Sequence, residues 1–420
     1  MQVFSVGGAV RDELLGRPVQ DRDYVVIGAT PAAMLELGFK PIGKDFPVFL
    51  HPQTHEEYAL ARTERKSGHG YKGFTFYCAP EVTLQEDLAR RDLTINAIAR
   101  SADGVLIDPY QGVADLKAQI LRHVSPAFSE DPVRILRIAR FAARFEHFVV
   151  APETMRLMCQ LVSQGEIAHL VAERVWQELA KGLLETRPSR MFEVLHACGA
   201  LRHLWPALPF ASEQYGAVAN ALLGVLDQLD QRGESLAVRF ALLSAYSFRA
   251  FKVDDSAAGK AEHSGGVHDD EQLFYAQPVR SVEALCARLK VPVHCRDLAV
   301  LTLRCQENGL LLQRYLDQGR STAELSELIV ALLEQTDALR RPQRFAQWLA
   351  VYAAHRQVRA VLAGTTDSAP DLQATHLLTQ ALAVIRGLDT ASIVRNSPDA
   401  GKIPEHLHAA RIDALRKMLS

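Results

Sequence analysis

The stretch VGGAVRDELLGRPVQDRDYVVIG (residues 6–28) places a glycine pair, an arginine and two aspartates around one turn, one short helix and one strand. Gly7 and Gly8 come after a predicted strand and before a predicted helix (9–16), so the backbone N–H groups of this turn can approach a phosphate closely. Arg11 lies one turn into that helix and could hold a phosphate directly. A Gly-Gly pair is also common in plain tight turns, so the pair leaves both interpretations open.

The two aspartates change this balance. Asp21 and Asp23 are two residues apart at the start of a predicted strand (23–28), so on a strand they would share one face. Like charges side by side repel, and folding alone does not require them there. Two carboxylates behind a phosphate-binding turn suit Mg²⁺, which is usually shared between carboxylates and substrate phosphates. The alternative is a solvated strand start.

Two further segments combine arginines with acidic or amide side chains. In LARRDLTINAIA (88–99), Arg90 and Arg91 precede Asp92, and Asn96 follows four residues later. An arginine here could neutralise triphosphate charge while Asp92 and Asn96 orient a ribose or the arginines. The alternative is a helix with an ordinary surface ion pair, which contributes little.

The segment SEDPVRILRIARFAARF (129–145) carries a basic stripe. Its polar members are spaced three, three, three and four residues apart, so they line one flank of a predicted helix opposite an apolar flank. They are Asp131, Arg134, Arg137, Arg140 and Arg144. Such a stripe is typical either of a solvated helix face or of a binding site.

Composition limits the class of protein. The chain has 420 residues, 48% of them apolar, and a formal net charge of −2, so a polyanion site must come from a local cluster of Arg and Lys. Its six cysteines include no C-x-x-C pair, which argues against a zinc ribbon or a disulfide framework and for a reducing compartment. No membrane span or targeting segment is predicted, so we expect a cytoplasmic protein without membrane contact.

The order of the patterns predicts an α/β head with a small mixed β-sheet, followed by a long all-α remainder. Short β-like runs alternate with short helices up to about residue 125, and helical spacing of apolar residues then continues almost to the end. Strands are predicted at 2–6, 23–28, 46–51, 56–62 and 104–109, and helices at 9–16, 31–38, 83–91, 131–145, 173–185 and 190–205. The polar segment 252–272 is predicted to be a flexible insertion.

Four blocks make a family resemblance specific. VGGAVRDELLGRPVQDRDYVVIG, RRDLTINAIA, IDPYQGVADL and EDPVRILRIARFAARF, with AERVWQELAKGLL after them, resemble the bacterial class II tRNA nucleotidyltransferases, the CCA-adding enzymes of the proteobacterial type. The resemblance covers roughly residues 1–180 and is loose beyond 200. It implies a nucleotidyltransferase head (1–125), a helical neck that binds the base and tRNA (126–205), and a helical body and tail (206–420).

The resemblance also implies roles for single residues. Asp21 and Asp23 would be the catalytic, Mg²⁺-binding carboxylates, and Glu57 is a candidate for a third acid. Gly8 and Arg11 would contact the nucleotide phosphates, with Arg91 in support. The segment 68–73 would belong to a mobile loop that helps the pocket switch from CTP to ATP.

The same resemblance assigns base reading to Asp131 and Arg134, with Arg137 and Arg140 completing the nucleotide site. A physical argument independent of the resemblance supports these roles, because cytosine and adenine both present an amino group beside a ring-nitrogen acceptor. A carboxylate accepts from the amine while a guanidinium donates to the ring nitrogen. UTP and GTP present a carbonyl instead, which leaves buried polar groups unpaired at a cost of about 1–3 kcal/mol each.

The chain departs from many relatives in its helical part, where an HD phosphohydrolase would carry a His-Asp pair. In VRFALLSAYSFRAF (238–251) the matching residues are Ala245 and Tyr246, neither of which can replace a hard-metal ligand. The dipeptide His268-Asp269 lies in the polar segment, without a rigid helix to hold it. We therefore expect phosphatase and cyclic phosphodiesterase activities to be absent.

These observations predict template-independent addition of C, C and A to the 3′ end of tRNA from CTP and ATP, with pyrophosphate released. The partners would be the tRNA acceptor arm and the two nucleotides, and no protein partner is evident. A poly(A) polymerase shares the head motifs, but a basic tail would be expected there, against a pI near 6.7 here. An enzyme that adds only A or only C, and a non-catalytic RNA-binding factor, also stay open.

Overall fold

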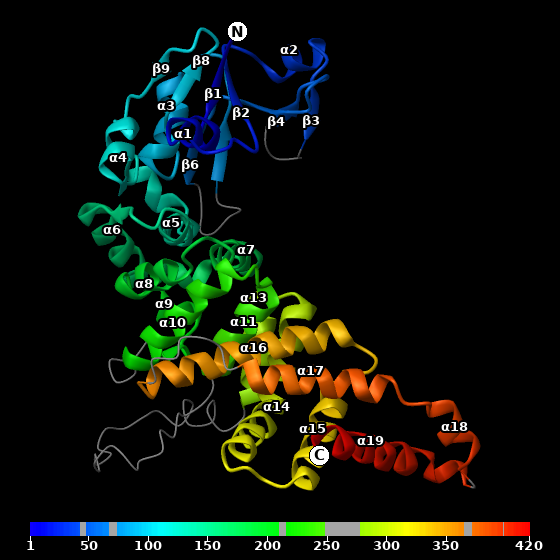
Figure 1. The fold of residues 1–420 in the computed structure, drawn as a ribbon. Coiled ribbons are helices and arrows are strands. Elements are labelled where there is room, and N and C mark those ends of the chain that lie inside the picture. The colour runs from blue at the N-terminus through cyan, green and yellow to red at the C-terminus, as the bar shows by residue number, and fades with distance from the viewer. Residues whose placement is uncertain (43–47, 67–73, 210–215, 248–277, 365–371, 398) are drawn as a thin grey trace. The chain divides into compact units, whose positions relative to one another are not determined.

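The computed structural model describes residues 1–42, 48–66, 74–209, 216–247, 278–364, 372–397 and 399–420. Within these ranges the chain forms two compact units, Met1–Pro206 and Ala207–Ser420, and Figure 1 traces the elements of each. The segment 68–73, the insertion 252–272 and the dipeptide His268-Asp269 lie outside the described residues.

The first unit contains a mixed sheet, as predicted. In the described part its strand order is β3-β4-β5-β2-β1-β8-β9, with β2 and β5 parallel and the other neighbours antiparallel. The strands are β1 (Gln2–Val6), β2 (Asp23–Ile27), β3 (Lys40–Ile42), β4 (Val48–Leu50), β5 (Glu57–Leu60), β8 (Ala99–Ser101) and β9 (Leu106–Ile107). Two further pairs stand apart: the hairpin β6 (Thr63–Lys66) with β7 (Phe74–Tyr77), and the parallel pair β10 (Ile120–Leu121) with β11 (Val149–Val150).

The strand DYVVI is buried on both faces of the sheet, which explains its continuous apolar run. Val25 packs into one core with Leu88 of α3 (Leu84–Ala89), and Val26 packs into the other with Met34 of α2 (Pro31–Glu36). The two helices therefore cover opposite faces (Figure 1). Because side chains alternate along a strand, Asp23 points to the α3 face together with Val25.

The register corrects one detail of the sequence analysis. β1 and β2 pair from Gln2 opposite Ile27 to Val6 opposite Asp23. The chain turns away at Gly7, and no strand that the structure describes pairs with the residues before Asp23. Asp21 consequently lies ahead of the strand and not on it, and the two aspartates do not share a strand face.

Helices complete the first unit around this sheet. They are α1 (Gly8–Leu14), α4 (Gly112–Ala118), α5 (Val133–Arg144), α6 (Pro152–Ser163), α7 (Ala172–Leu183), α8 (Ser189–Ala197) and α9 (Leu201–Leu204), with short 3-10 turns η1 (Thr94–Asn96), η2 (Pro126–Glu130) and η3 (Glu166–His169). α5 packs against α7 and α8. The single helix predicted at 190–205 is two helices, because Gly199 adopts a left-handed backbone with φ 79° between them.

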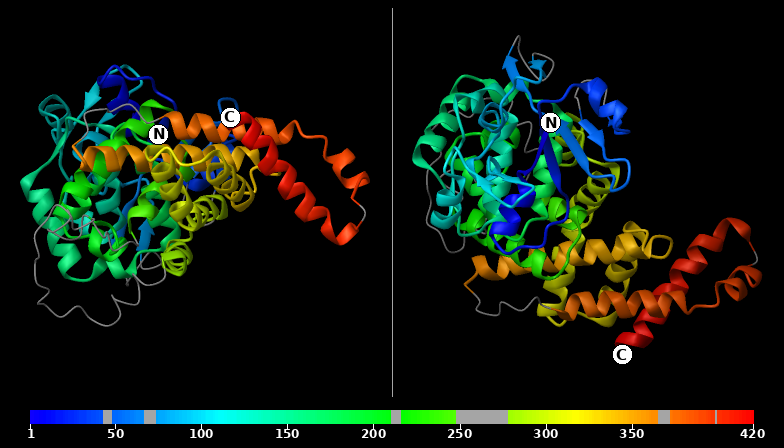
Figure 2. Two further views of the ribbon diagram at one scale, coloured as in Figure 1. Left: turned by 60° about the horizontal axis from the view of Figure 1, so that its bottom comes forward. Right: turned by 90° about the horizontal axis from the view of Figure 1, so that it is seen from above.

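The second unit is all-helical in its described part. Its elements are α10 (Gly216–Gln231), α11 (Leu236–Ser247), α13 (Pro278–Leu289), α14 (Val293–Asp317), α15 (Thr322–Gln335), α16 (Pro342–Leu362), α17 (Leu372–Arg386), α18 (Thr390–Arg395), η6 (Ala400–Lys402) and α19 (Ile403–Leu419). α11 packs between α14 and α16, and the last helix, red in Figure 2, packs against α15 and α17. Among the helices described, none is long and apolar enough to cross a membrane.

Candidate active site

A pocket of about 730 Å³ lies between the central strands of the sheet and helices α5 and α7 of the first unit. Ten arginine and lysine side chains but only four aspartates line it, in a chain whose formal net charge is −2. The lining residues are Gly7, Gly8, Arg11, Asp21, Asp23, Arg62, Arg90, Arg91, Asp92, Asn96, Asp131, Arg134, Arg137, Arg140, Phe141, Arg144, Arg174 and Lys181. The pocket is thus the local basic cluster that an anionic ligand requires.

The predicted acidic pair lies at this pocket. Asp21 and Asp23 both line it, and neither side-chain carboxylate accepts a hydrogen bond from the part of the chain that the structure describes. Partial burial and the nearby charge of Asp21 raise the pKa of Asp23, while Arg91 opposes that rise. Glu57 on β5 sits directly beside Asp23 in the parallel register, on the same face of the sheet, but it does not line the pocket.

This donor set fits a hard divalent cation. Among the described residues, no group of three or more His, Cys, Asp or Glu side chains is placed to hold a metal ion alone. Magnesium is usually bound through one or two carboxylates, with substrate phosphates and water as the remaining ligands. Two unpartnered carboxylates facing a basic pocket match a cation that binds together with an anionic substrate.

The turn at Gly7 packs closely against Arg91, which lines the pocket. Gly7 has φ +72°, and a Cβ added there would lie 2.9 Å from Nη1 of Arg91. Any other residue would be strained and would push that guanidinium away. Arg11, on the helix that follows, is only 3% exposed, and it donates to Asp12 at 2.8 Å and 3.0 Å and to Asn96 Oδ1 at 2.6 Å. Its direct contact with a phosphate stays a prediction, because its observed bonds hold the turn and η1 together.

Arg90 and Arg91 share one acid. Asp87 of α3 accepts from Arg90 Nε at 3.0 Å and Nη2 at 2.7 Å, and from Arg91 Nη2 at 3.3 Å. Burial works against its charged form, but the attraction of the two arginines holds the pKa of Asp87 below its usual value. In the described part, Arg91 Nε is buried without a hydrogen-bond partner.

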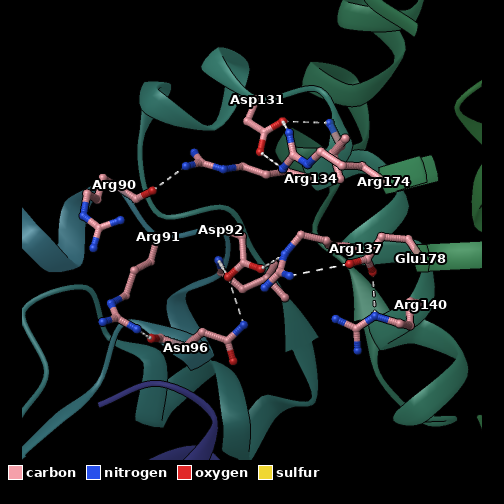
Figure 3. Close-up of polar contacts among 12 residues, drawn as sticks. Arg90, Arg91, Asp92, Asn96, Asp131, Arg134, Arg137, Arg140, Arg174 and Glu178 are labelled. Atoms are coloured by element: carbon pink, nitrogen blue, oxygen red, sulfur yellow. Dashed lines mark hydrogen bonds and ion pairs between the residues drawn. The ribbon is translucent and has the colours of Figure 1, made fainter. Parts of the chain in front are cut away.

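Asp92 and Asn96 orient arginines, which is one of the two roles considered from the sequence. Asp92 accepts from Arg137 Nε at 2.8 Å and from Asn96 Nδ2 at 2.9 Å (Figure 3). Burial would raise the pKa of Asp92, yet the charge of Arg137 and these hydrogen bonds keep it well below its ordinary value. The same ion pair raises the pKa of Arg137.

Asp131 and Arg134, the predicted base readers, are both held in place. Both terminal nitrogens of Arg174 on α7 donate to Asp131, at 3.1 Å and 2.7 Å. The terminal nitrogens of Arg134 donate to the backbone carbonyls of Ala127 and Arg90, each at 2.6 Å. Figure 3 shows the two side chains side by side above Asp92. The carboxylate and guanidinium planes are therefore fixed by neighbours.

The remaining arginines of α5 line the pocket and do not form a solvated helix face. Arg140 Nε donates to Glu178 of α7 at 2.6 Å, and Arg137 Nη1 lies 3.6 Å from the same carboxylate. Arg144 donates to Asp12 at 2.8 Å. The guanidinium of Arg140 lies over the Phe141 ring at 4.4 Å from its centroid, which stabilises it through cation–π attraction.

The residues predicted from the sequence form most of this pocket, but three of its basic side chains were not predicted. Every predicted nucleotide-site residue lines it: Gly8, Arg11, Asp21, Asp23, Arg91, Asp131, Arg134, Arg137 and Arg140. Arg62, Arg174 and Lys181 also line it but were not predicted. Arg174 and Lys181 are seven residues apart, so they share one face of α7, a signal that the sequence did contain. Arg62 follows β5 and carried no comparable signal.

Comparisons with known proteins identify the domains and the fold. Family models described as the poly A polymerase head domain and the probable RNA and SrmB-binding site of polymerase A match residues 3–122 and 147–211. A solved CCA-adding enzyme in an apo form shares the fold at TM-score 0.68 and 21% identity, covering 99% of this chain and 88% of that chain. A CCA-adding enzyme in complex with CTP gives TM-score 0.66 and 22% identity, covering 99% and 87%.

Curated relatives match along the whole chain. A multifunctional CCA protein from Dechloromonas aromatica (strain RCB) is 52% identical over 427 residues, covering 100% of this chain and 98% of that protein. Another from Azoarcus sp. (strain BH72) is 49% identical, covering 100% and 97%. The resemblance predicted for residues 1–180 is confirmed and extends over the whole chain, so the chain belongs to the family of the CCA-adding enzymes, among the multifunctional CCA proteins.

Proposed function

We propose that the chain adds C, C and A to the 3′ end of tRNA from CTP and ATP and releases pyrophosphate. The observation that carries this proposal is the pocket in which two aspartates, whose carboxylates have no hydrogen-bond partner among the described residues, face a wall of arginines. The full-length likeness to multifunctional CCA proteins supports the same activity. Addition of the whole CCA, rather than of A or C alone, is part of the proposal.

Asp21 and Asp23 would hold Mg²⁺ at the pocket edge. Bound together with the triphosphate, the ion would activate the attacking 3′-hydroxyl and shield the charge on the leaving pyrophosphate. The backbone at Gly8 would approach the phosphates, and the guanidinium of Arg91, which lines the pocket, would support them. Arg11 would support this wall from beneath, and Glu57, beside Asp23 in the sheet, is the candidate third acid.

Base selection would rest on Asp131 and Arg134. Asp131 accepts two hydrogen bonds from Arg174 and one from the Val133 N–H at 3.3 Å. A carboxylate has about four lone-pair sites, so it can also accept from the amino group of cytosine or adenine. Arg134, held by two carbonyls, would donate to the ring nitrogen. Arg137 and Arg140, fixed by Asp92 and Glu178, would complete the site.

The test is nucleotide addition to tRNA that ends at its discriminator base. With CTP alone we expect two residues and then arrest, and with CTP and ATP we expect CCA and no further growth. A ladder of A residues from ATP alone would instead indicate a poly(A) polymerase, whose head-domain model also matches this chain. Normal extension by an Asp21→Ala protein would overturn the metal assignment, and absence of any extension would favour an RNA-binding factor.

We also propose that the chain lacks an HD-type phosphohydrolase, although the names of its relatives imply several functions. Ala245 and Tyr246 lie on α11 with 1% and 2% exposure, so they pack in the core of the second unit. The Tyr246 hydroxyl donates to the His355 carbonyl at 3.2 Å, and the two rings lie 5.2 Å apart. These positions therefore serve packing.

Hydrolysis of 2′,3′-cyclic AMP by the pure protein, with and without added Ni²⁺ or Mg²⁺, tests this second proposal. We expect no metal-dependent hydrolysis. Hydrolysis that disappears in a His268→Ala protein would show that the His268-Asp269 dipeptide, which lies outside the described residues, holds a metal after all.

A further inference from the structure

Asp87 is the most deeply buried acid beside the pocket, yet it does not line it. It lies on α3, and its side chain is 0% exposed. A buried carboxylate is costly unless opposite charges and hydrogen bonds compensate it. Asp87 meets this condition through groups from two different segments: the guanidinium groups of Arg90 and Arg91, and the backbone N–H of Arg62 at 3.4 Å.

All three partners of Asp87 line the pocket. Arg62 follows β5, whose neighbour β2 begins with Asp23, and the Ala61 N–H donates to the Val26 carbonyl at 2.9 Å. Arg90 and Arg91 follow α3 directly. One carboxylate thus ties the exit of a central strand to two cations of the pocket wall.

The orientation of the arginines shows what this tie does. Arg91 Nη2 bonds to Asp87, while Nη1 lies 3.5 Å from the Asn96 carbonyl and against Gly7. Asp87 Oδ1 accepts from two nitrogens of Arg90, whereas Oδ2 accepts from one nitrogen of Arg91. Two guanidinium charges share one carboxylate charge, so a net positive charge stays available for an anion at the pocket wall.

We propose that Asp87 is a positioning residue of the nucleotide site, which holds Arg90 and Arg91 toward the triphosphate and locks both to Arg62. The proposal rests on the proposed function, because it takes the ligand to be CTP or ATP. Asp87 acts through the arginines and does not touch the substrate.

Two simpler readings make different predictions. If Asp87 only stabilises the fold, its loss lowers the amount of active protein but leaves the KM of the surviving molecules unchanged. If its negative charge merely weakens the pocket's attraction for anions, its loss lowers the KM for nucleotides. If Asp87 positions the arginines, its loss raises that KM, because misdirected guanidinium groups no longer meet the phosphates.

The experiment measures kcat and KM for CTP on tRNA that ends at the discriminator base, and for ATP on tRNA that ends in CC. We expect Asp87→Asn to raise the KM for both nucleotides about 10- to 100-fold, with the KM for tRNA unchanged. The inhibition constant of inorganic pyrophosphate should rise in parallel. Asp87→Glu, which keeps the charge but displaces it by one methylene, should show a smaller rise and serves if the first variant fails to fold.

The matched control is Glu86→Gln at the neighbouring position. Glu86 is exposed, and within the described ranges its side chain bonds only to Thr83 in the capping box of α3, so this change weakens the same helix without touching the arginines. Its nucleotide KM should equal that of the wild type. An unchanged or lowered KM in both Asp87 variants would overturn the positioning role while wild-type CCA addition stayed intact. Failure of the wild type to use CTP and ATP would instead overturn the proposed function.

Discussion

Replacing Asp131 by Asn tests whether protein side chains, and not a nucleic-acid strand, select the base of the incoming nucleotide. The carboxylate receives Arg174 Nη1 at 3.1 Å on one oxygen and Nη2 at 2.7 Å on the other. An amide can accept only one of these bonds, because its NH₂ group would face a guanidinium donor. The variant also loses the charged acceptor for the amino group of cytosine or adenine.

The expected loss follows from the value of one hydrogen bond to a charged group, about 1.5–3 kcal/mol. At about 1.4 kcal/mol per factor of ten, this corresponds to a fall in kcat/KM of roughly 10- to 150-fold for both CTP and ATP. The amide NH₂ can donate to a carbonyl, so UTP should be accepted better relative to CTP than by the wild type.

Single-turnover addition to tRNA that ends at the discriminator base measures both effects, with CTP and UTP in separate and in competing reactions. Asp115→Asn is the matched control, because Asp115 is also ion-paired, accepting Arg122 Nε at 3.1 Å, but does not line the pocket. The reasoning fails if Asp131→Asn keeps kcat/KM for CTP within about twofold of the control, or if UTP stays equally excluded.

Three further predictions follow from the same geometry. Asn at Asp21 or Asp23 should lower kcat by roughly three orders of magnitude, since metal-assisted charge stabilisation contributes several kcal/mol, and EDTA should abolish wild-type addition until Mg²⁺ is restored. Gly7→Ala, at φ +72° and 2.9 Å from Arg91 Nη1, should lower the urea midpoint of unfolding by the equivalent of about 1–2 kcal/mol and raise the nucleotide KM; an unchanged KM would contradict the packing argument. Because the folded-state pKa of Asp92 is depressed, its contribution to stability is present above pH ~4 and is lost as the pH falls further. The difference in urea midpoint between wild type and Asp92→Asn should therefore narrow below that pH, and a constant difference would refute the assignment.

Much of the fold was predictable where a local pattern coincides with burial. The strand at 23–27 is buried on both faces and reads as a continuous apolar run, and α5 repeats its apolar flank at helical spacing. The short strands β8, β10 and β11 have two or three residues each and pair with segments distant in sequence, β8 with β1 and β10 with β11, so no local pattern marks them. Asp21 was misplaced for a related reason, because a strand starts where its partner strand ends.

The site was predictable as a set of cations but not as a network. Spacing on one helix brought Arg134, Arg137 and Arg140 together, whereas their partners come from residues as far apart as Asp92 and Glu178. Which acid supports which arginine is a property of the folded state, since it depends on how α5 packs against α7 and against the segment after α3. The seven-residue spacing of Arg174 and Lys181 was the one sequence feature indicating that a second helix, α7, contributes basic side chains to the pocket.

The acids beside the pocket explain how so many arginines can lie close together. Five arginines of the pocket wall would repel one another in a medium of low dielectric constant if their charges were not compensated. They are Arg90, Arg91, Arg137, Arg140 and Arg174. Each of the acids Asp87, Asp92, Asp131 and Glu178 instead fixes one or two guanidinium groups by short ion pairs, so their orientations are set when the chain folds. Binding then loses little side-chain entropy, because the donors already point into the pocket. Selecting C and A without a nucleic-acid template also requires a rigid array of donors with one carboxylate. A flexible array would adapt to the carbonyl groups of U and G and would lose this selectivity.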